Sequence, residues 1–220
     1  MNMKTEIRRS ETVLFGNQNS GHSYKVALML VLCDIPYTYR HISLALSIDP
    51  SQRPQEFRNV SQFGQVPVLI HDGHTLWQSN AILSYLAEHS GQFPCRARVG
   101  PGIDRWQVQA WLFWEAVHIG FSLPKLRFLY LAGIDNPTLK NTLIEAVNHD
   151  LNQLEKGLGA KEFLLGDQPS IADISCCGYL YWADQAEVDI HEWPTVSAWL
   201  SRLSSLLNWQ SPQTLMARND

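Results

Sequence analysis

The fold of this 220-residue chain is decided by residues 64–79, which read GQVPVLIHDGHTLWQS. Residues 64–70 are predicted to be a strand with a proline at its entrance, and the Asp-Gly pair at 72–73 is a hairpin turn that leads into a return strand. Because Pro67 has no N–H to give to a sheet ladder, we expect its strand to lie at an edge of the sheet. The bond before Pro67 is a candidate for the cis form, since X–Pro bonds favour trans by only about 0.5–1 kcal/mol. Such a turn offers the backbone of Val66 to an extended ligand.

The segment after this hairpin is predicted to be a helix. Apolar residues recur there at helical spacing, at Ala81, Ile82, Tyr85 and Leu86. Gln78 and Ser79 therefore stand at a helix N-terminus, where free N–H groups and the helix dipole favour a bound carboxylate. An N-cap would explain Ser79 equally well. It would not explain why a carboxylate site lies beside a free peptide edge.

The composition is that of a globular protein with a sizeable core. Hydrophobic residues make up 45% and aromatic residues 10%, and the length suits one large domain or two modest ones. The net charge of −4 provides no basic surface, which argues against nucleic-acid binding. The longest apolar run, residues 26–33, is far shorter than the about 20 residues that a membrane-spanning helix needs, so we expect no membrane association.

The cysteines and the N-terminus indicate a cytoplasmic protein. Cys33, Cys95, Cys176 and Cys177 show neither a C-x-x-C motif nor a zinc spacing. Small buried apolar residues in a reducing compartment are the expected role of these cysteines. Residues 1–10 are polar and charged and lack the apolar stretch of a signal peptide.

Alternating strands and helices predict a thioredoxin-like first domain. Strand and helix patterns follow one another at residues 12–15, 22–33, 37–44 and 54–59, then come the hairpin and a helix at 79–89. The first strand, helix and strand favour a parallel pair with a right-handed crossover, and the hairpin adds antiparallel pairs. The helix at 22–33 is apolar almost all round, so it should be covered on both sides.

The remainder of the chain is predicted to be all-helical. Residues 90–102 form a linker by their prolines and glycines, so the chain divides into a tail at 1–11, a thioredoxin-like domain at 12–89, the linker, and a helical domain at 103–220. An aromatic stripe from Trp106 to Phe121 is more typical of a core than of a pocket.

Two local signals mark helix starts within this domain. Asn136 and Pro137 begin a long helix that ends at Gly157 to Gly159. Ser170 and Asp173 form a capping box before another apolar helix, which is a folding role and not a chemical one.

Three motifs occur in a fixed order, Gln65-Val66-Pro67, Gln78-Ser79 and Ser170-x-x-Asp173. In a chain with a thioredoxin-like half, a linker and a helical half, this order resembles the cytosolic glutathione S-transferase family. The resemblance covers residues 12 to about 212. It implies that glutathione, γ-Glu-Cys-Gly, lies along the first domain as an added strand.

Several site residues follow from the resemblance. Val66 and Pro67 would pair with the cysteinyl residue, and Gln78 and Ser79 would hold the γ-glutamyl end. Gln52 and Gln65 occupy positions that reach the glycine carboxylate. Asp104 resembles an acid that contacts the γ-glutamyl amine across a dimer interface, although a solvated acid at a helix start is the simpler explanation. The family also implies a homodimer.

The glutathione thiol needs an activating group near the start of the first helix. Lowering a thiol pKa by about two units requires about 2.7 kcal/mol. One hydrogen bond to a charged group supplies about 1.5–3 kcal/mol, so a single hydroxyl is sufficient. Ser20 is placed like the activating serine of bacterial-type members of the serine class, and we predict this catalytic role for it. Asn17, His22 and Ser23 remain rivals.

The pocket for an electrophile should lie between the two domains. Trp114, His118, Phe121 and Arg127 are predicted lining residues, together with Asn17 and His22. No metal site is expected. A turn separates His71 from His74, and Glu115 with His118 would be only half of a di-iron motif.

The predicted function is a glutathione transferase that conjugates glutathione to a small hydrophobic electrophile, with glutathione peroxidase as a side activity. A glutathione-dependent disulfide reductase is an alternative, but it would need a cysteine near position 20. A non-catalytic binding or assembly protein is a further candidate.

Overall fold

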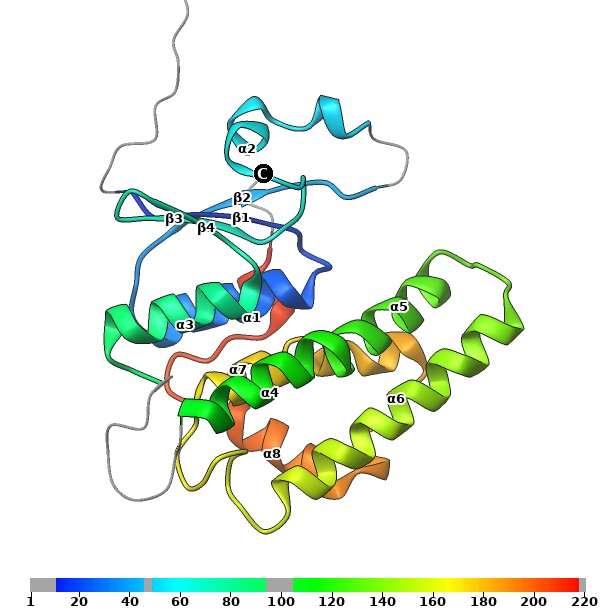
Figure 1. Cartoon of the computed structure of the whole chain (residues 1–220). Coiled ribbons are helices and arrows are strands. Elements are labelled where there is room, and N and C mark those ends of the chain that lie inside the picture. Colours follow the sequence, from blue (N-terminus) through cyan, green and yellow to red (C-terminus); the bar gives the residue numbers. More distant parts are fainter. Residues whose placement is uncertain (1–10, 46–48, 94–104, 218–220) are drawn as a thin grey trace, which may run out of the picture.

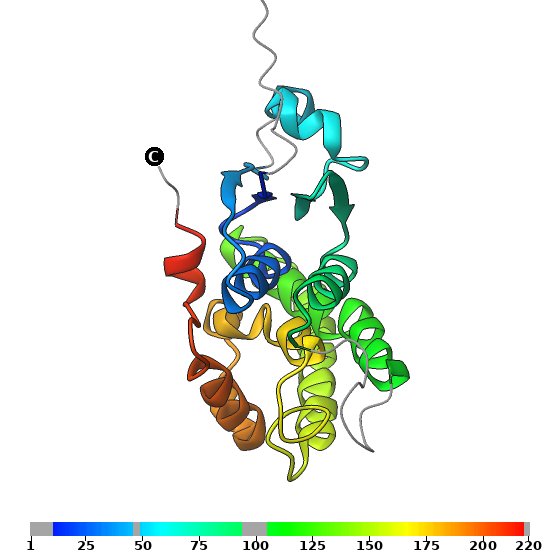
Figure 2. The ribbon, with the colours of Figure 1, turned by 90° about the vertical axis from the view of Figure 1, so that its left-hand side faces the viewer.

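The computed structural model describes residues 11–45, 49–93 and 105–217, and it has the predicted fold class. One half is a small sheet with helices, and the other half is helical (Figure 1). The first half consists of β1 (Val13–Gly16), α1 (Gly21–Leu32), β2 (Thr38–His41), the short 3-10 helix η1 (Pro50–Gln52), α2 (Gln55–Val60), β3 (Val68–His71), β4 (His74–Trp77) and α3 (Ser79–Ser90). Helix α2 covers one face of the sheet, while α1 and α3 lie between the sheet and the helical half (Figures 1 and 2).

The sheet is mixed, as predicted, but the strand after Pro67 is not at its edge. The strand order is β2-β1-β3-β4, with β1 parallel to β2 and antiparallel to β3. Strand β3 therefore pairs on both sides, and the expectation of an edge strand was wrong. The ladder begins only at Val68, so Pro67 precedes it and interrupts no pairing. The Val66–Pro67 bond is cis.

Helix α1 is the central element of the first half, and it is covered on all sides as its apolar sequence predicted. All its residues except His22 and Val31 are buried. It contacts β1 and α3 in its own half and α5, α7 and α9 in the other. Lys25 is fully buried in this helix.

The second half consists of α4 (Arg105–Val117), α5 (Ile119–Leu131), α6 (Pro137–Leu158), α7 (Ile171–Cys177), the 3-10 helices η2 (Leu180–Ala186) and η3 (Ile190–Glu192), α8 (Pro194–Ser204) and α9 (Pro212–Leu215). Both predicted helix starts are confirmed. The Asn136 side chain accepts a hydrogen bond from the backbone N–H of Leu139. Ser170 and Asp173 form the complete capping box of α7.

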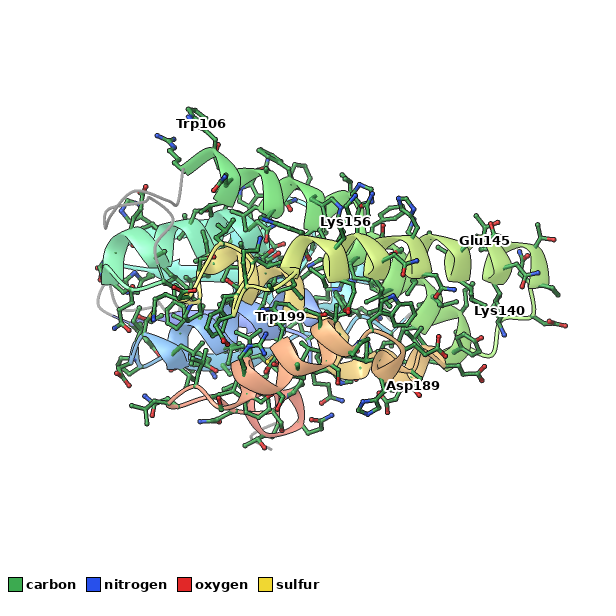
Figure 3. The ribbon with its side chains drawn as sticks, turned by 90° about the horizontal axis from the view of Figure 1, so that it is seen from below. Trp106, Lys140, Glu145, Lys156, Asp189 and Trp199 are labelled. Atoms are coloured by element: carbon green, nitrogen blue, oxygen red, sulfur yellow. The ribbon has the colours of Figure 1, made fainter. Side chains whose placement is uncertain are left out.

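The aromatic stripe from Trp106 to Phe121 is mainly an exposed face, contrary to its interpretation as core. Trp106 is 64% exposed and Phe113 73% exposed, and Figure 3 shows Trp106 projecting from the first turn of α4. The chain also breaks at His118, where α4 gives way to α5. Apolar spacing predicts a helix, but it does not say which face another element covers.

In the part of the chain that the structure describes, no helix combines the length and apolar character that crossing a membrane requires.

Candidate functional site

A cavity of about 1210 Å³ opens where the sheet half meets α4 and α5. Typical ligand pockets measure about 300–1,000 Å³, so this one has room for a tripeptide and a second small molecule. The cavity brings together eight of the predicted site residues, Asn17, Ser20, His22, Gln65, Val66, Pro67, Gln78 and Ser79. They come from the β1–α1 loop with the first turn of α1, from the segment before β3, and from the N-cap and start of α3, which are separate in sequence.

Three predicted aromatic and imidazole residues are not brought to this cavity. Trp114, His118 and Phe121 do not line it, and their assignment as pocket residues was wrong. Trp114 donates a hydrogen bond to Gln153 of α6 and stacks on His118, which itself bonds to Asp150.

Gln52 is exposed and does not line the cavity either. Asp104 lies outside the described residues. Arg127, by contrast, lies in the cavity wall as predicted.

The helix faces explain why the aromatic assignment failed. The cavity is lined from α4 by Leu112, Phe113 and Ala116, and from α5 by Pro124, Phe128 and Leu131. Neighbouring residues on a helix point about 100° apart, which follows from 3.6 residues per turn. Trp114 and His118 instead bond to Gln153 and Asp150 of α6, and Phe121 is 49% exposed. An aromatic stripe alone does not reveal which of its residues face the cavity.

Ser20 is the N-cap of α1 and lines the cavity, and its hydroxyl accepts one hydrogen bond from the backbone. The Ser23 backbone N–H donates to Oγ of Ser20 at 3.2 Å. The Tyr179 phenol is also in hydrogen-bond contact with the Ser20 side chain; burial raises the pKa of that phenol, while the Ser20 contact acts to lower it. A hydroxyl has one proton and two lone pairs. The Ser23 N–H occupies one lone pair, and the Ser20 proton can be donated to the Tyr179 oxygen or to an acceptor in the cavity.

The rival residues for thiol activation are less well placed. Ser23 is fully buried, does not line the cavity, and accepts a hydrogen bond from the Asn17 backbone N–H. The Asn17 carboxamide is engaged at both ends, donating to the Ile42 carbonyl and accepting from the Asn19 N–H.

His22 is available in the cavity, but it is not a cation near neutral pH. Burial and the nearby Lys25 charge together lower its pKa to about 4, against the opposite effects of Glu115 and a backbone hydrogen bond at Gly120. A neutral imidazole offers a thiolate no full positive charge. Of the four candidates, Ser20 is the one with a hydroxyl that lines the cavity.

The start of α3 is built for an anion. Gln78 is its N-cap with φ +66°, a conformation that non-glycine residues seldom adopt outside special sites, and no side chain caps the helix. Ser79 is the first helical residue and not the cap itself, and it is buried in the cavity wall. The first N–H groups of this 12-residue helix are therefore directed at the cavity without a side-chain acceptor.

Arg53 is a cavity residue that the sequence analysis missed. Its Nη1 donates to the Gly64 carbonyl at 2.6 Å, next to Gln65. Its Nε is buried and has no hydrogen-bond partner among the described residues. The Pro-rich context around position 53 gave no signal for this role, because the contact depends on a loop that folds back over eleven residues.

The inner wall of the cavity is a buried polar cluster that joins the two halves. The Lys25 ammonium lies 2.8 Å from Glu115 Oε2 and donates to Asn80 Oδ1 at 2.8 Å. Asn80 in turn donates to Glu115, and Ser175 of α7 bonds to Asn80. Burial alone would raise the pKa of Glu115, but the Lys25 charge, His22 and these hydrogen bonds hold that pKa below its usual range.

Asn80 and Glu115 both line the cavity, so this cluster fixes the second residue of α3 against α4. It supports the α3 N-terminus at Gln78 and Ser79 from behind.

Arg127 carries a positive charge into the cavity wall from α5. It donates to the Asn19 carbonyl at 2.7 Å and to the Gln185 carboxamide at 2.9 Å, and it lies over the Trp182 ring. Both hydrogen-bond acceptors are neutral. Within the described residues, no carboxylate forms an ion pair with this guanidinium.

Family models match both halves of the chain. The model described as "Glutathione S-transferase, N-terminal domain" matches residues 19–89, and "Glutathione S-transferase, C-terminal domain" matches residues 131–209. A maleylacetoacetate isomerase from Rhizobium meliloti (strain 1021) is 30% identical over 198 residues, which are 86% of this chain and 89% of that protein.

Solved structures show the same fold. A glutathione S-transferase from Pseudomonas fluorescens Pf-5 is 31% identical with a TM-score of 0.79, and the match covers 92% of this chain and 99% of that one. A glutathione transferase family member from Pseudomonas fluorescens pf-5, with two glutathione bound, also has a TM-score of 0.79, covering 96% and 95% of the two chains. At 22% identity, this second likeness concerns the fold alone.

Proposed function

This chain belongs to the glutathione S-transferase family, and we propose that it is a glutathione transferase for small hydrophobic electrophiles. Glutathione lies along Val66 and Pro67, with its γ-glutamyl carboxylate at the start of α3. Its thiol proton leaves to solvent, and Ser20 donates a hydrogen bond to the thiolate. The sulfur then bonds to an electrophilic carbon as the leaving group departs. The Ser20 hydroxyl, which lies at the start of α1 in the same cavity as Val66 and Ser79, carries this proposal.

The proposal is tested by titrating the bound thiol. In Ser20→Ala, the pKa of bound glutathione should rise by about one to two units, because a hydrogen bond to a charged group is worth about 1.5–3 kcal/mol. The thiolate absorbance measured against pH reports this shift, and conjugation of chlorodinitrobenzene should fall in parallel. Ser20→Thr keeps a hydroxyl and an N-cap and should retain most of both. An unchanged titration in Ser20→Ala would remove Ser20 from the mechanism.

Arg53 is proposed to bind the glycine carboxylate, a role that the sequence suggested for Gln52 and Gln65. Its unpartnered Nε beside Gln65 supports the assignment. Arg53→Gln should raise KM for glutathione about tenfold or more with little change in kcat, since uniform binding is lost. Gln52→Ala is the matched control, because Gln52 is exposed outside the cavity.

A second candidate function is a glutathione-dependent isomerisation of a carboxylate-bearing substrate such as maleylacetoacetate. Arg127, with neutral hydrogen-bond acceptors only, is the observation that favours it. Glutathione thiolate would add to the double bond, the single bond would rotate, and elimination would restore glutathione. Turnover of maleylacetoacetate that exceeds conjugation of chlorodinitrobenzene would favour this function, and Arg127→Met should then reduce the isomerisation more than the conjugation.

A disulfide reductase fits the cavity less well than either function. Such an enzyme needs a cysteine in the site, and none of the described cysteines, Cys33, Cys176 and Cys177, lines the cavity. A glutathione peroxidase side activity would use the same thiolate as the transferase. A non-catalytic binding protein would be retained on immobilised glutathione yet conjugate nothing.

We also propose a cytoplasmic homodimer. Its support is the exposed apolar face of α4 and α5, which includes Trp106, Phe113, Val117 and Phe121. Exposed apolar patches of this kind are typical of protein interfaces. Sedimentation of wild type and Val117→Lys tests it, with a dimer that weakens in the variant as the expected result. The predicted role of Asp104 depends on that dimer.

A further inference from the structure

We propose that His71, Asp72 and His89 form a binding site for a divalent transition metal ion such as Zn²⁺, separate from the glutathione cavity. Each residue offers one ligand atom, and these three atoms all lie within 4.8 Å of one another. His71 and Asp72 come from the end of β3 and the hairpin turn, while His89 comes from the last turn of α3. None of the three lines the cavity.

The ligand set matches the chemistry of late first-row metals. Two imidazoles and one carboxylate suit Zn²⁺, Co²⁺ or Ni²⁺ and leave at least one coordination position for water. A lone acidic cluster would instead suit Ca²⁺ or Mg²⁺. His71 lies opposite His74 in the β3–β4 hairpin, and the fold also brings its ring against that of His89, eighteen positions along the chain.

The distances are close to those of a coordinated ion. Metal–ligand bonds of about 2.1 Å in a tetrahedron place ligand atoms about 3.4 Å apart. Asp72 Oδ2 is already 3.9 Å from His89 Nε2, and these side chains are 59% and 42% exposed, so they can rotate inward. The buried ring of His71 supplies the fixed side of the site.

Tyr85 orients both imidazoles. Its hydroxyl lies 2.9 Å from Nδ1 of His71, and its ring stacks on that of His89 with 5.9 Å between centroids. The two imidazole rings stand perpendicular with centroids 4.5 Å apart. Hydrogen-bonded partners of this kind hold metal-binding imidazoles in place and set which nitrogen is free.

A bound ion would clip the β3–β4 hairpin to the end of α3. The other end of α3 carries Ser79, so the ion would stabilise the sheet half without touching the reaction. Because an ion binds the folded chain, Zn²⁺ should raise the melting temperature of the metal-free protein.

The test uses the full chain without a histidine tag, freed of metal by a chelator. Calorimetric titration with Zn²⁺ should show one saturable equivalent, and Co²⁺ should give d–d bands without a sulfur charge-transfer band. Both signals and the Zn²⁺-dependent rise in melting temperature should be lost in His89→Ala, an exposed position that tolerates substitution. Tyr85→Phe should weaken binding about tenfold.

His191→Ala is the matched control, because His191 is an exposed histidine on η3 in the other half. It should bind Zn²⁺ like the wild type. The proposal is overturned if the wild type shows no saturable equivalent, or if His89→Ala and Asp72→Asn bind as tightly as the wild type. Activity with glutathione does not enter these readouts.

Discussion

Glu115 and Asp173 are both buried carboxylates, with 2% and 0% exposure, yet their environments are opposite. Glu115 lies between the halves of the molecule beside the Lys25 ammonium. Asp173 lies within the helical half and is held by neutral donors, namely the backbone N–H groups of Leu164 and Ser170 and the indole of Trp199. Burial raises the pKa of Asp173. Burial also acts to raise the pKa of Glu115, but the Lys25 charge, His22 and the hydrogen bonds together outweigh it and lower that pKa.

The difference separates a local folding device from a long-range one. The hydrogen-bond donors to Asp173 are uncharged, and most of them belong to its own helical turn or to the segment just before that turn. Glu115 depends on side chains from α1, α3 and α7, which meet only in the finished structure. We therefore expect Asp173 to govern the stability of one helix, and Glu115 to couple stability to the proposed glutathione site.

The largest expected effect is the loss of one member of the buried pair. Lys25→Met leaves Glu115 buried without its cation, and such a change typically costs about 3–5 kcal/mol. The double variant Lys25→Met with Glu115→Leu should be destabilised by less than the single one, because no uncompensated charge remains. Urea unfolding measures both.

The exposed pair Arg202–Glu162 is the control for this prediction, and Arg202→Met should cost well under 1 kcal/mol. The double variant should also raise KM for glutathione, since Asn80 loses two partners behind the α3 N-terminus. If the double variant is less stable than Lys25→Met, the two groups do not act as a pair.

A somewhat smaller loss is expected at Asp173. In the wild type, N–H donors face both carboxylate oxygens of Asp173. Asp173→Asn replaces one of these oxygens with an NH₂ group and leaves its donors unsatisfied, and unsatisfied buried donors cost about 1–3 kcal/mol each. We expect about 2–3 kcal/mol by urea unfolding, against about 1 kcal/mol for Ser170→Ala at the same cap. The KM for glutathione should stay unchanged in both variants. A KM effect as large as that of the Lys25 pair would erase the distinction between the two regions.

The same contrast explains what could be predicted from the sequence. The capping box was predictable because Ser170 and Asp173 are three positions apart and their geometry is fixed by one helical turn. The Val66–Pro67 turn and the α3 N-terminus were predictable for the same reason, as short motifs that carry their own geometry.

What could not be predicted depends on contacts between distant segments. Glu115 reads as an ordinary polar residue of α4, because its cation is ninety positions away. Trp114 and Phe121 were assigned to the pocket since helical spacing gives a stripe but not its rotation. The prediction that β3 lies at a sheet edge was wrong because the missing N–H of Pro67 affects only that residue, and strand pairing begins one residue later, at Val68.

The smallest expected effect is a difference in the sign of pH dependence. The pKa of Glu115 is lowered on folding, so its contribution to stability is present above the usual value of 4.5 and is lost as the pH falls through the folded pKa. The pKa of Asp173 is raised, so its contribution is full below 3.8 and is lost as the pH rises through the folded pKa. The free energy of unfolding should therefore differ between wild type and Glu115→Gln more at neutral than at acidic pH. Between wild type and Asp173→Asn, it should differ more at acidic pH. Urea titrations across this range measure both differences, and equal slopes would mean that the neutral donors around Asp173 favour its ionised form as strongly as Lys25 favours that of Glu115.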